Sequence, residues 1–197
     1  MNPPRPRRTI HLAHDAVRSV VQPGDHVVDA TAGNGHDTVF LAELVGEGGL
    51  VTAFDIQDQA LATTWQRLET AELKGRVALV HQGHETMVQH CEPGLAAVMF
   101  NLGYLPSADH AVITTEKTTL SALEQAFSLL KEGGMLTCLC YPGHPGGEQE
   151  AETVTHWFRA QSNVAKITGL ADHSLERPFL LTLHKQKGPL PEGRRAF

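Results

Sequence analysis

The chain has 197 residues, 41% of them hydrophobic and 19% charged, and its 16 Lys and Arg against 22 Asp and Glu give a formal charge of −6. This length suits one domain with a sizeable core, and the composition excludes wholesale disorder. No apolar run reaches the roughly 18–20 residues that span a bilayer, the start has no apolar stretch typical of a secretory signal, and the acidic balance argues against a broad nucleic-acid surface. Three cysteines are too few for a disulfide framework, so we expect a cytoplasmic protein.

Strand-like and helix-like segments alternate along the chain. In chain order, the pattern predicts a strand at 26–30, a helix at 39–45, a strand at 49–55, a helix at 60–73 and a strand at 76–81. A short helix at 85–90, a strand at 95–103, a helix at 118–131, a strand at 135–141 and a helix at 150–161 follow. Two strands, 163–170 and 178–185, close the chain with only a polar turn between them, so we expect them to pair antiparallel.

Repeated alternation of strands and helices implies right-handed crossovers and a mainly parallel sheet with helices on both faces. Together with the closing pair, it predicts an α/β fold, a doubly wound sheet with one antiparallel strand near its C-terminal edge. We expect a single domain over residues 1–197, with frayed tails at 1–8 and 188–197.

The loop after the first predicted strand is the most informative segment, DATAGNGHDT at 29–38. Gly33 and Gly35 let the backbone approach a ligand that a Cβ would exclude, and the strand–loop–helix context indicates a nucleotide site. Asp55 ends the next strand, where a carboxylate can accept both ribose hydroxyls. In the alternative interpretation, the glycines only make a tight turn and Asp55 only caps the next helix.

Two cofactors compete for this loop, a dinucleotide and S-adenosylmethionine. A dinucleotide loop has a third glycine or an alanine where this chain has Thr38, and Asp37 puts negative charge where a pyrophosphate would lie. Asp29, at the end of the first strand, suits a ligand that carries an ammonium and a sulfonium. The residues favour S-adenosylmethionine.

A second polar group follows the fourth predicted strand, in NLGYLP at 101–106. Asn101 offers an amide oxygen to a target amine, and Tyr104 offers a face on which a base can stack. The segment resembles the N-P-P-Y loop of amino-methyltransferases, with leucine and glycine in place of the prolines. It continues through Asp109 and His110.

The fifth predicted strand leads into YPGHPGG at 141–147, which holds an aromatic ring, Tyr141, and a titratable imidazole, His144. Ligands of open α/β sheets lie beyond the carboxyl ends of the strands, so we expect these residues and Asn101 at one cleft.

Taken together, DATAGNGHDT, FDIQ at 54–57, NLGYLP with Asp109, and YPGHPGG with Glu150 resemble the small methyltransferases of the putative rRNA methylase family. The similarity in order and spacing runs from about His11 to Lys185. The chain departs from that family at Ala108, where a glycine is expected.

The resemblance implies a seven-stranded, Rossmann-like class I methyltransferase that uses S-adenosylmethionine to methylate the 5-aminomethyl group of 2-thiouridine at the tRNA wobble position. It implies cofactor contacts from Gly33, Asn34, Gly35, His36, Asp37, Thr38, Asp55, Gln57 and His84, the last near the adenine, and we add Asn101 and Asp29. It places Asn101, Tyr104, Asp109, Tyr141 and His144 at the target base, and we add His110.

We expect Asn101, Tyr104, Asp109 and His144 to carry the catalysis. Transfer to nitrogen needs a free lone pair, and an alkylamine is mostly protonated at neutral pH. Asp109 and His144 are the candidates that take the proton, directly or through water.

Twelve histidines invite a metal hypothesis, but a metal site needs three or four converging ligands, and we expect none. Cys138 and Cys140 alternate on one predicted strand and are expected to fill the core. His11 and His14 lie three apart on a predicted helix, where a place at the cleft entrance and a place on the solvated surface are equally compatible with the pattern.

Two tryptophans and a basic start complete the conspicuous residues. Trp65 and Trp157 have apolar helical spacing and are expected in the core. Arg5, Arg7 and Arg8 could touch phosphate, but a short charged tail is usually just solvated.

Four functions remain in competition. The first is methylation of a tRNA wobble uridine, with the anticodon arm as partner and no membrane involved; a homodimer would enlarge the surface that one small domain offers. The second is methylation of another RNA or a small metabolite, which the negative charge supports. The third is an NAD-dependent oxidoreductase, against which Thr38 and the 101–106 loop count. The fourth is a non-catalytic binding module, disfavoured by the intact loop residues.

Overall fold

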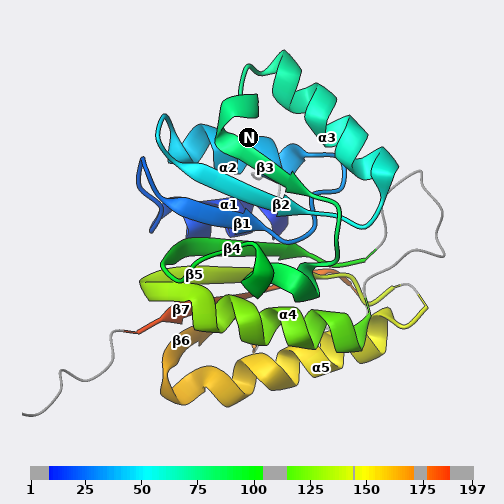
Figure 1. Cartoon of the computed structure of the whole chain (residues 1–197). Coiled ribbons are helices and arrows are strands. Elements are labelled where there is room, and N and C mark those ends of the chain that lie inside the picture. Colours follow the sequence, from blue (N-terminus) through cyan, green and yellow to red (C-terminus); the bar gives the residue numbers. More distant parts are fainter. Residues whose placement is uncertain (1–8, 104–114, 144, 171–176, 187–197) are drawn as a thin grey trace, which may run out of the picture.

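A seven-stranded sheet runs through the computed structural model, which describes residues 9–103, 115–143, 145–170 and 177–186 (Figure 1). The strands lie in the order β3-β2-β1-β4-β5-β7-β6. Their bounds are β1 His26–Asp29, β2 Leu50–Phe54, β3 Val77–Val80, β4 Leu95–Asn101, β5 Leu130–Cys140, β6 Ala165–Thr168 and β7 Phe179–Lys185. Neighbouring strands from β3 to β5 pair parallel, whereas β7 pairs antiparallel with both β5 and β6. The predicted fold class is confirmed.

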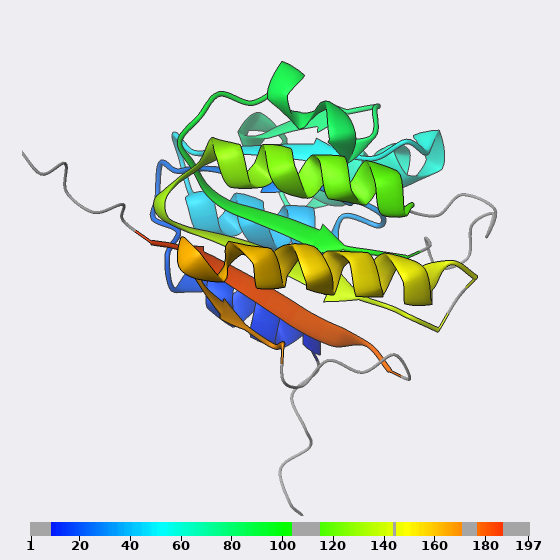
Figure 2. The same ribbon diagram turned by 90° about the horizontal axis from the view of Figure 1, so that it is seen from below.

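Helices cover both faces of the sheet (Figures 1 and 2). One face carries α1 Thr9–Arg18, α2 His36–Val45 and α3 Asp58–Thr70, and the other carries α4 Glu116–Leu129 and α5 Gly147–Ala160 with the 3₁₀ helix η2 His84–Gln89. Two shorter 3₁₀ helices are η1 Lys74–Arg76 and η3 Gln161–Asn163. No helix in the described part of the chain is long and apolar enough to cross a membrane.

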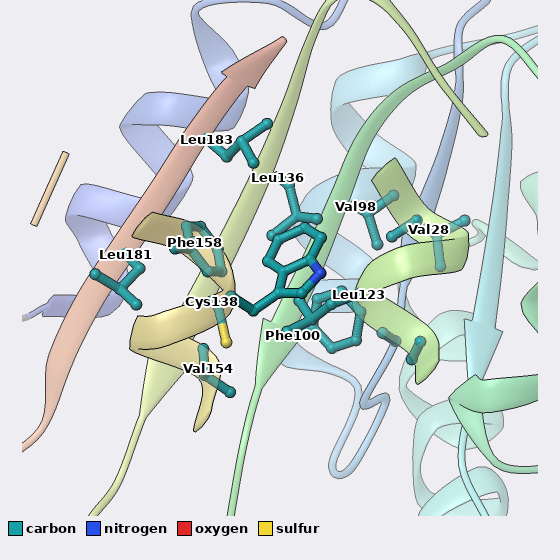
Figure 3. Close-up of a cluster of buried hydrophobic side chains, with 14 of the residues drawn as sticks. Val28, Val98, Phe100, Leu123, Leu136, Cys138, Val154, Phe158, Leu181 and Leu183 are labelled. Carbon is teal, nitrogen blue, oxygen red and sulfur yellow. The ribbon is translucent and has the colours of Figure 1, made fainter. Parts of the chain in front are cut away.

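Two apolar clusters hold these layers together. The cluster beneath α4 and α5 includes Phe100, Leu136, Cys138 and Phe158 (Figure 3), and the other joins α1 and α2 to the opposite face. Because β4 is covered on both faces, it is a continuous apolar run without alternation, as expected of a central parallel strand. Cys138 and Cys140 are both buried with their sulfur atoms 3.9 Å apart, so their predicted place in the core is confirmed.

The prediction for Trp65 is wrong. The buried side chains of α3 are Ala60, Thr64 and Leu68, and Trp65 lies one residue off that stripe, with 46% of its surface exposed. The Lys74 ammonium lies 4.3 Å from the centre of its ring. Trp157, by contrast, is buried as predicted.

The helix predicted at 118–131 ends earlier than expected. Leu129 is the last residue of α4, and Leu130 already pairs with Leu95 of β4. Met135 then pairs with Ala97, so residues 131–134 form an excursion from the ladder between these two pairs. Gly133 lies within it at φ +76°, a conformation that favours glycine. Gly133 therefore serves this excursion of the strand.

Candidate active site

A cavity of about 510 Å³ opens at the carboxyl ends of the strands. Its walls come from the segments that follow β1, β2, β3, β4 and β5 and from the start of α4. β1 lies beside the central strand β4, and the helices that follow these two strands, α2 and α4, pack on opposite faces of the sheet. Ligands of doubly wound folds bind at such a switch point. The cavity is therefore the candidate site.

Most of the predicted site residues that the structure describes meet in this cavity. Its lining includes Gly33, Asn34, His36, Asp37, Asp55, Gln57, His84, Asn101 and Tyr141. Asp29, Gly35 and Thr38 are not part of the lining. Tyr104, Asp109, His110 and His144 lie outside the described residues, so their roles stay predictions.

Asp29 supports the glycine loop from behind. It is 1% exposed, and its carboxylate accepts hydrogen bonds from the Thr38 hydroxyl at 2.6 Å and from the Thr31 amide at 3.1 Å. Burial, reinforced by the negative charge of Asp37, raises the pKa of Asp29 to about 7. The geometry gives Asp29 a scaffolding role, where the sequence suggested direct contact with the ligand.

Helix α3 fixes the glycine loop from the other side. Thr64 donates its hydroxyl to the Gly33 carbonyl at 3.0 Å, and the Arg67 Nε donates to the Asn34 carbonyl at 2.8 Å. Gly35 has φ +77°, and a Cβ there would lie 2.8–3.0 Å from Thr64. Only glycine fits this position without displacing α3.

Asp55 joins the glycine loop to the segment after β2. One carboxylate oxygen accepts the Gly33 amide at 2.9 Å and the other accepts the Gln57 amide at 2.9 Å. A carboxylate has about four lone-pair directions, so both oxygens can accept further hydrogen bonds from the cavity. This arrangement suits a ligand with neighbouring hydroxyl groups.

His84 contributes a neutral imidazole to the wall. It is 6% exposed, its Nδ1 lies 3.0 Å from the Ala30 carbonyl oxygen, and its ring packs edge-on against Phe100. Burial lowers the pKa of His84. Because a carbonyl only accepts, Nδ1 carries the proton and Nε2 remains an acceptor, which suits an amino group such as that of adenine.

Asn101 and Asp37 form the other end of the cavity. The Asn101 backbone amide donates to the Thr31 hydroxyl at 2.8 Å, and its side-chain amide lies 3.4 Å from one oxygen of Asp37. The second oxygen of Asp37 lies 2.7 Å from Nε2 of His14. Tyr141 is 38% exposed, and partial burial together with the charge of Asp37 raises the pKa of its hydroxyl.

The charge of the lining is one-sided. Among the described lining residues, Asp37, Asp55 and Glu85 are carboxylates, and none is a lysine or an arginine. A pyrophosphate would find no cation there, whereas a ligand with an ammonium and a sulfonium finds carboxylates. The cavity therefore fits S-adenosylmethionine better than a dinucleotide. No three His, Cys, Asp or Glu side chains gather as metal ligands in the described ranges.

Several lining residues carry no signal in the sequence. Glu85, Thr115 and Thr118 belong to no motif, and only their position just after a strand or at the start of a helix could have suggested them. Thr31 and Ile56 lie within the DATAGNGHDT and FDIQ segments, but nothing in those segments singles them out. His14 lies on α1 and contacts Asp37. Its spacing in the sequence was compatible both with the cleft entrance and with the solvated surface.

Residues 51–178 match the sequence model of the putative rRNA methylase family. The chain belongs to this family. A putative rRNA methylase from Clostridium thermocellum is 41% identical and superposes with a TM-score of 0.85, over 91% of this chain and 98% of that one. A putative methyltransferase from Streptococcus mutans, solved in complex with SAH, is 36% identical with a TM-score of 0.80, over 91% and 98% of the two chains.

A relative whose name states an activity is the chloroplastic tRNA (mnm5s2U34)-methyltransferase of Arabidopsis thaliana, 40% identical over 158 residues. The match covers 75% of this chain and 58% of that protein. Demethylmenaquinone methyltransferases are more distant: that of Alkalihalophilus pseudofirmus is 26% identical over 122 residues, 47% of its length. The chain thus spans about half the length of the curated relatives it matches.

Proposed function

We propose that this protein methylates the 5-aminomethyl group of 2-thiouridine at the wobble position of tRNA, with S-adenosylmethionine as the methyl donor. Its family and its class I fold make it an S-adenosylmethionine-dependent methyltransferase. The acceptor is the finer part of the proposal. The observation that carries it is the 40% identity, over 158 residues, to a tRNA (mnm5s2U34)-methyltransferase.

The cofactor end of the cavity supplies binding groups of the right chemistry. Asp55 would accept the ribose hydroxyls, and Nε2 of His84 would accept from the adenine amino group. Gly33 and Asn34 offer a loop whose backbone is held by α3, and Asp37 offers negative charge to the cationic part of the cofactor. His36 and Gln57, which line the cavity, would keep their predicted cofactor roles, whereas Thr38 lies outside the lining and bonds Asp29.

S-adenosylmethionine supplies, when bound, a methyl group on a positively charged sulfur. What the protein adds is alignment of the acceptor, which can be worth an effective molarity of about 10⁵–10⁸ M. The amide oxygen of Asn101 would accept an N–H of the acceptor amine and direct its lone pair into the cavity. Tyr141, half-exposed at the same end, offers a ring to the base.

The acceptor proposal is tested with two preparations of one tRNA, with and without the aminomethyl group on the wobble uridine. Wild-type protein should transfer labelled methyl only to the modified tRNA, because a bare uridine has no amine to receive it. Equal rates on both would refute amine specificity. Calorimetry with S-adenosylmethionine and with NAD on the same sample tests the cofactor, and we expect a micromolar Kd, about −8 kcal/mol, for the former alone.

A small metabolite is the second candidate acceptor. The described lining has no lysine or arginine to meet a phosphate. The demethylmenaquinone methyltransferase of Alkalihalophilus pseudofirmus also resembles this chain, over 122 residues. Methyl transfer to a small amine at the rate seen with modified tRNA would favour this alternative. The anticodon arm as partner and the homodimer stay predictions.

A further inference from the structure

We propose that His14 is a positioning residue of the methyl-transfer site, which orients the Asp37 carboxylate and through it the side-chain amide of Asn101. The inference rests on the proposed function in one respect: Asn101 is taken as the residue that receives the acceptor amine. His14 lies on α1, outside the glycine loop and outside every motif of the sequence.

The contacts of His14 hold its ring in one orientation. Nε2 lies 2.7 Å from Oδ1 of Asp37, and the imidazole stacks on Phe40 with ring centres 3.8 Å apart and planes 6° from parallel. Asp37 and Phe40 are three residues apart on α2, so one turn of that helix receives both contacts. The guanidinium of Arg18 lies 4.8 Å from the centre of the Phe40 ring. The ring can therefore neither tilt nor turn without losing a contact.

Asp37 transmits this orientation to the cavity. Its Oδ1 faces His14, and its Oδ2 lies 3.4 Å from Nδ2 of Asn101. An ionised carboxylate only accepts hydrogen bonds, so the Asn101 amide must turn its NH₂ toward Asp37. Its carbonyl oxygen is then directed away from Asp37 and is left to accept from an amine. Without the hydrogen bond to His14, the carboxylate could rotate and the amide would lose this constraint.

The exposure of the two partners fits a positioning role. The side chain of Asp37 is 8% exposed and that of His14 is 17% exposed. A carboxylate so shielded from water depends on protein donors, and a hydrogen bond to a charged group is stronger than a neutral one. The stack on Phe40 serves the packing of α1 on α2, and the bond to Asp37 adds an orientation of the carboxylate that the stack does not supply. Two substitutions separate these roles.

His14→Phe keeps a ring to stack on Phe40 and removes the hydrogen-bond donor, whereas His14→Gln keeps a donor and removes the ring. His11→Phe is the matched control, since His11 is an exposed histidine on the same helix. The first measurement is hydrogen exchange of the Asn101 side-chain NH₂ by NMR, with no acceptor present. We expect about tenfold faster exchange in His14→Phe, near-normal exchange in His14→Gln and no change in His11→Phe.

The second measurement is the single-turnover rate on aminomethyl tRNA together with the Kd for S-adenosylmethionine. We expect His14→Phe to slow transfer about tenfold or more while the Kd changes less than about threefold, because the variant keeps the Asp37 carboxylate near the cofactor and loses only its orientation toward Asn101. In an Asn101→Ala background, the same substitution should cost almost nothing further, because both act through one amide.

The results separate this inference from the acceptor proposal. If wild-type protein leaves aminomethyl tRNA unmethylated, the proposed acceptor is wrong, and the Asn101 exchange still decides the role of His14. Unchanged exchange in His14→Phe overturns the inference, whatever the acceptor. A loss of rate that adds fully to that of Asn101→Ala also overturns it.

Discussion

The two ends of the cavity are built differently. At the cofactor end, both oxygens of Asp55 accept backbone amides at 2.9 Å, and the glycine loop is held from behind by Asp29 and from the side by Thr64 and Arg67. At the other end, the Asn101 side chain has a 3.4 Å contact with Asp37, which itself depends on His14 of a distant helix. At the cofactor end, side chains from several elements bond the backbone of the glycine loop, whereas the acceptor end is aligned by side chains bonded to one another.

This difference suggests a division of labour. A backbone loop that is held at several points suits a ligand that is the same in every turnover, since a preformed site loses little entropy on binding. A chain of side chains suits alignment of the reacting group, where small displacements cost rate more than affinity. Substitutions at the two ends should therefore separate rate from binding.

The largest effect is expected at Asn101. Asn101→Ala removes the amide oxygen that would hold the acceptor amine, and the loss of one such positioning hydrogen bond costs about 2–4 kcal/mol in the transition state, or about 30- to 1000-fold in rate. The Kd for S-adenosylmethionine and the melting temperature should stay near wild type. Single-turnover kinetics, calorimetry and thermal melts measure the three quantities. A parallel loss of rate, cofactor affinity and thermal stability would mean that this segment is only a structural turn.

A smaller effect, on cofactor binding more than on rate, is expected at Asp55. Asp55→Ala removes an acceptor for the ribose hydroxyls and leaves the Gly33 and Gln57 amides without their partner. Cofactor affinity should fall by about 1.5–3 kcal/mol, with a smaller change in the rate at saturating cofactor. Calorimetry with S-adenosylmethionine is the test, and unchanged affinity would remove Asp55 from the ribose site.

The last effect is expected at Asp29; it is an effect on stability, and it depends on pH. The pKa of Asp29 is about 7 in the folded protein against an ordinary 3.8, so between these values the folded state holds a proton that the unfolded state has lost. Stability therefore falls as pH rises from about 4 to 7 and then levels off. Asp29→Asn keeps a side chain that can bond Thr31 and Thr38 and removes this penalty.

Thermal melts of wild type and Asp29→Asn across that pH range measure the difference. The gap should widen in favour of the variant as pH rises to 7, by at most about 4 kcal/mol for a pKa raised from 3.8 to about 7, and each kcal/mol is worth about 2–4 °C for a chain of this size. A constant gap at every pH would mean that Asp29 does not keep its proton on folding.

Local sequence pattern accounts for most of the fold and for the cofactor end of the site. The apolar runs predict all seven strands, and the glycine pair with Asp55 predicts the loop that lines the cavity. The errors fall where the local pattern is ambiguous. Trp65 has a spacing compatible with either side of the apolar stripe of α3, and only the way that helix lies on the sheet decides that the tryptophan faces water.

The sequence by itself determined the strand–helix alternation, the glycine loop and the carboxylate of Asp55 just after β2, because each depends on neighbours in the chain. Only the tertiary structure decided that β7 inserts between β5 and β6, that Asp29 supports the loop from behind, and that His14, Asp37 and Asn101 meet. His14 and Asp37 are 23 residues apart, and Asp37 and Asn101 are 64 apart. No periodicity or motif spans such separations, since these contacts exist only once α1 and α2 pack on the same face of the sheet.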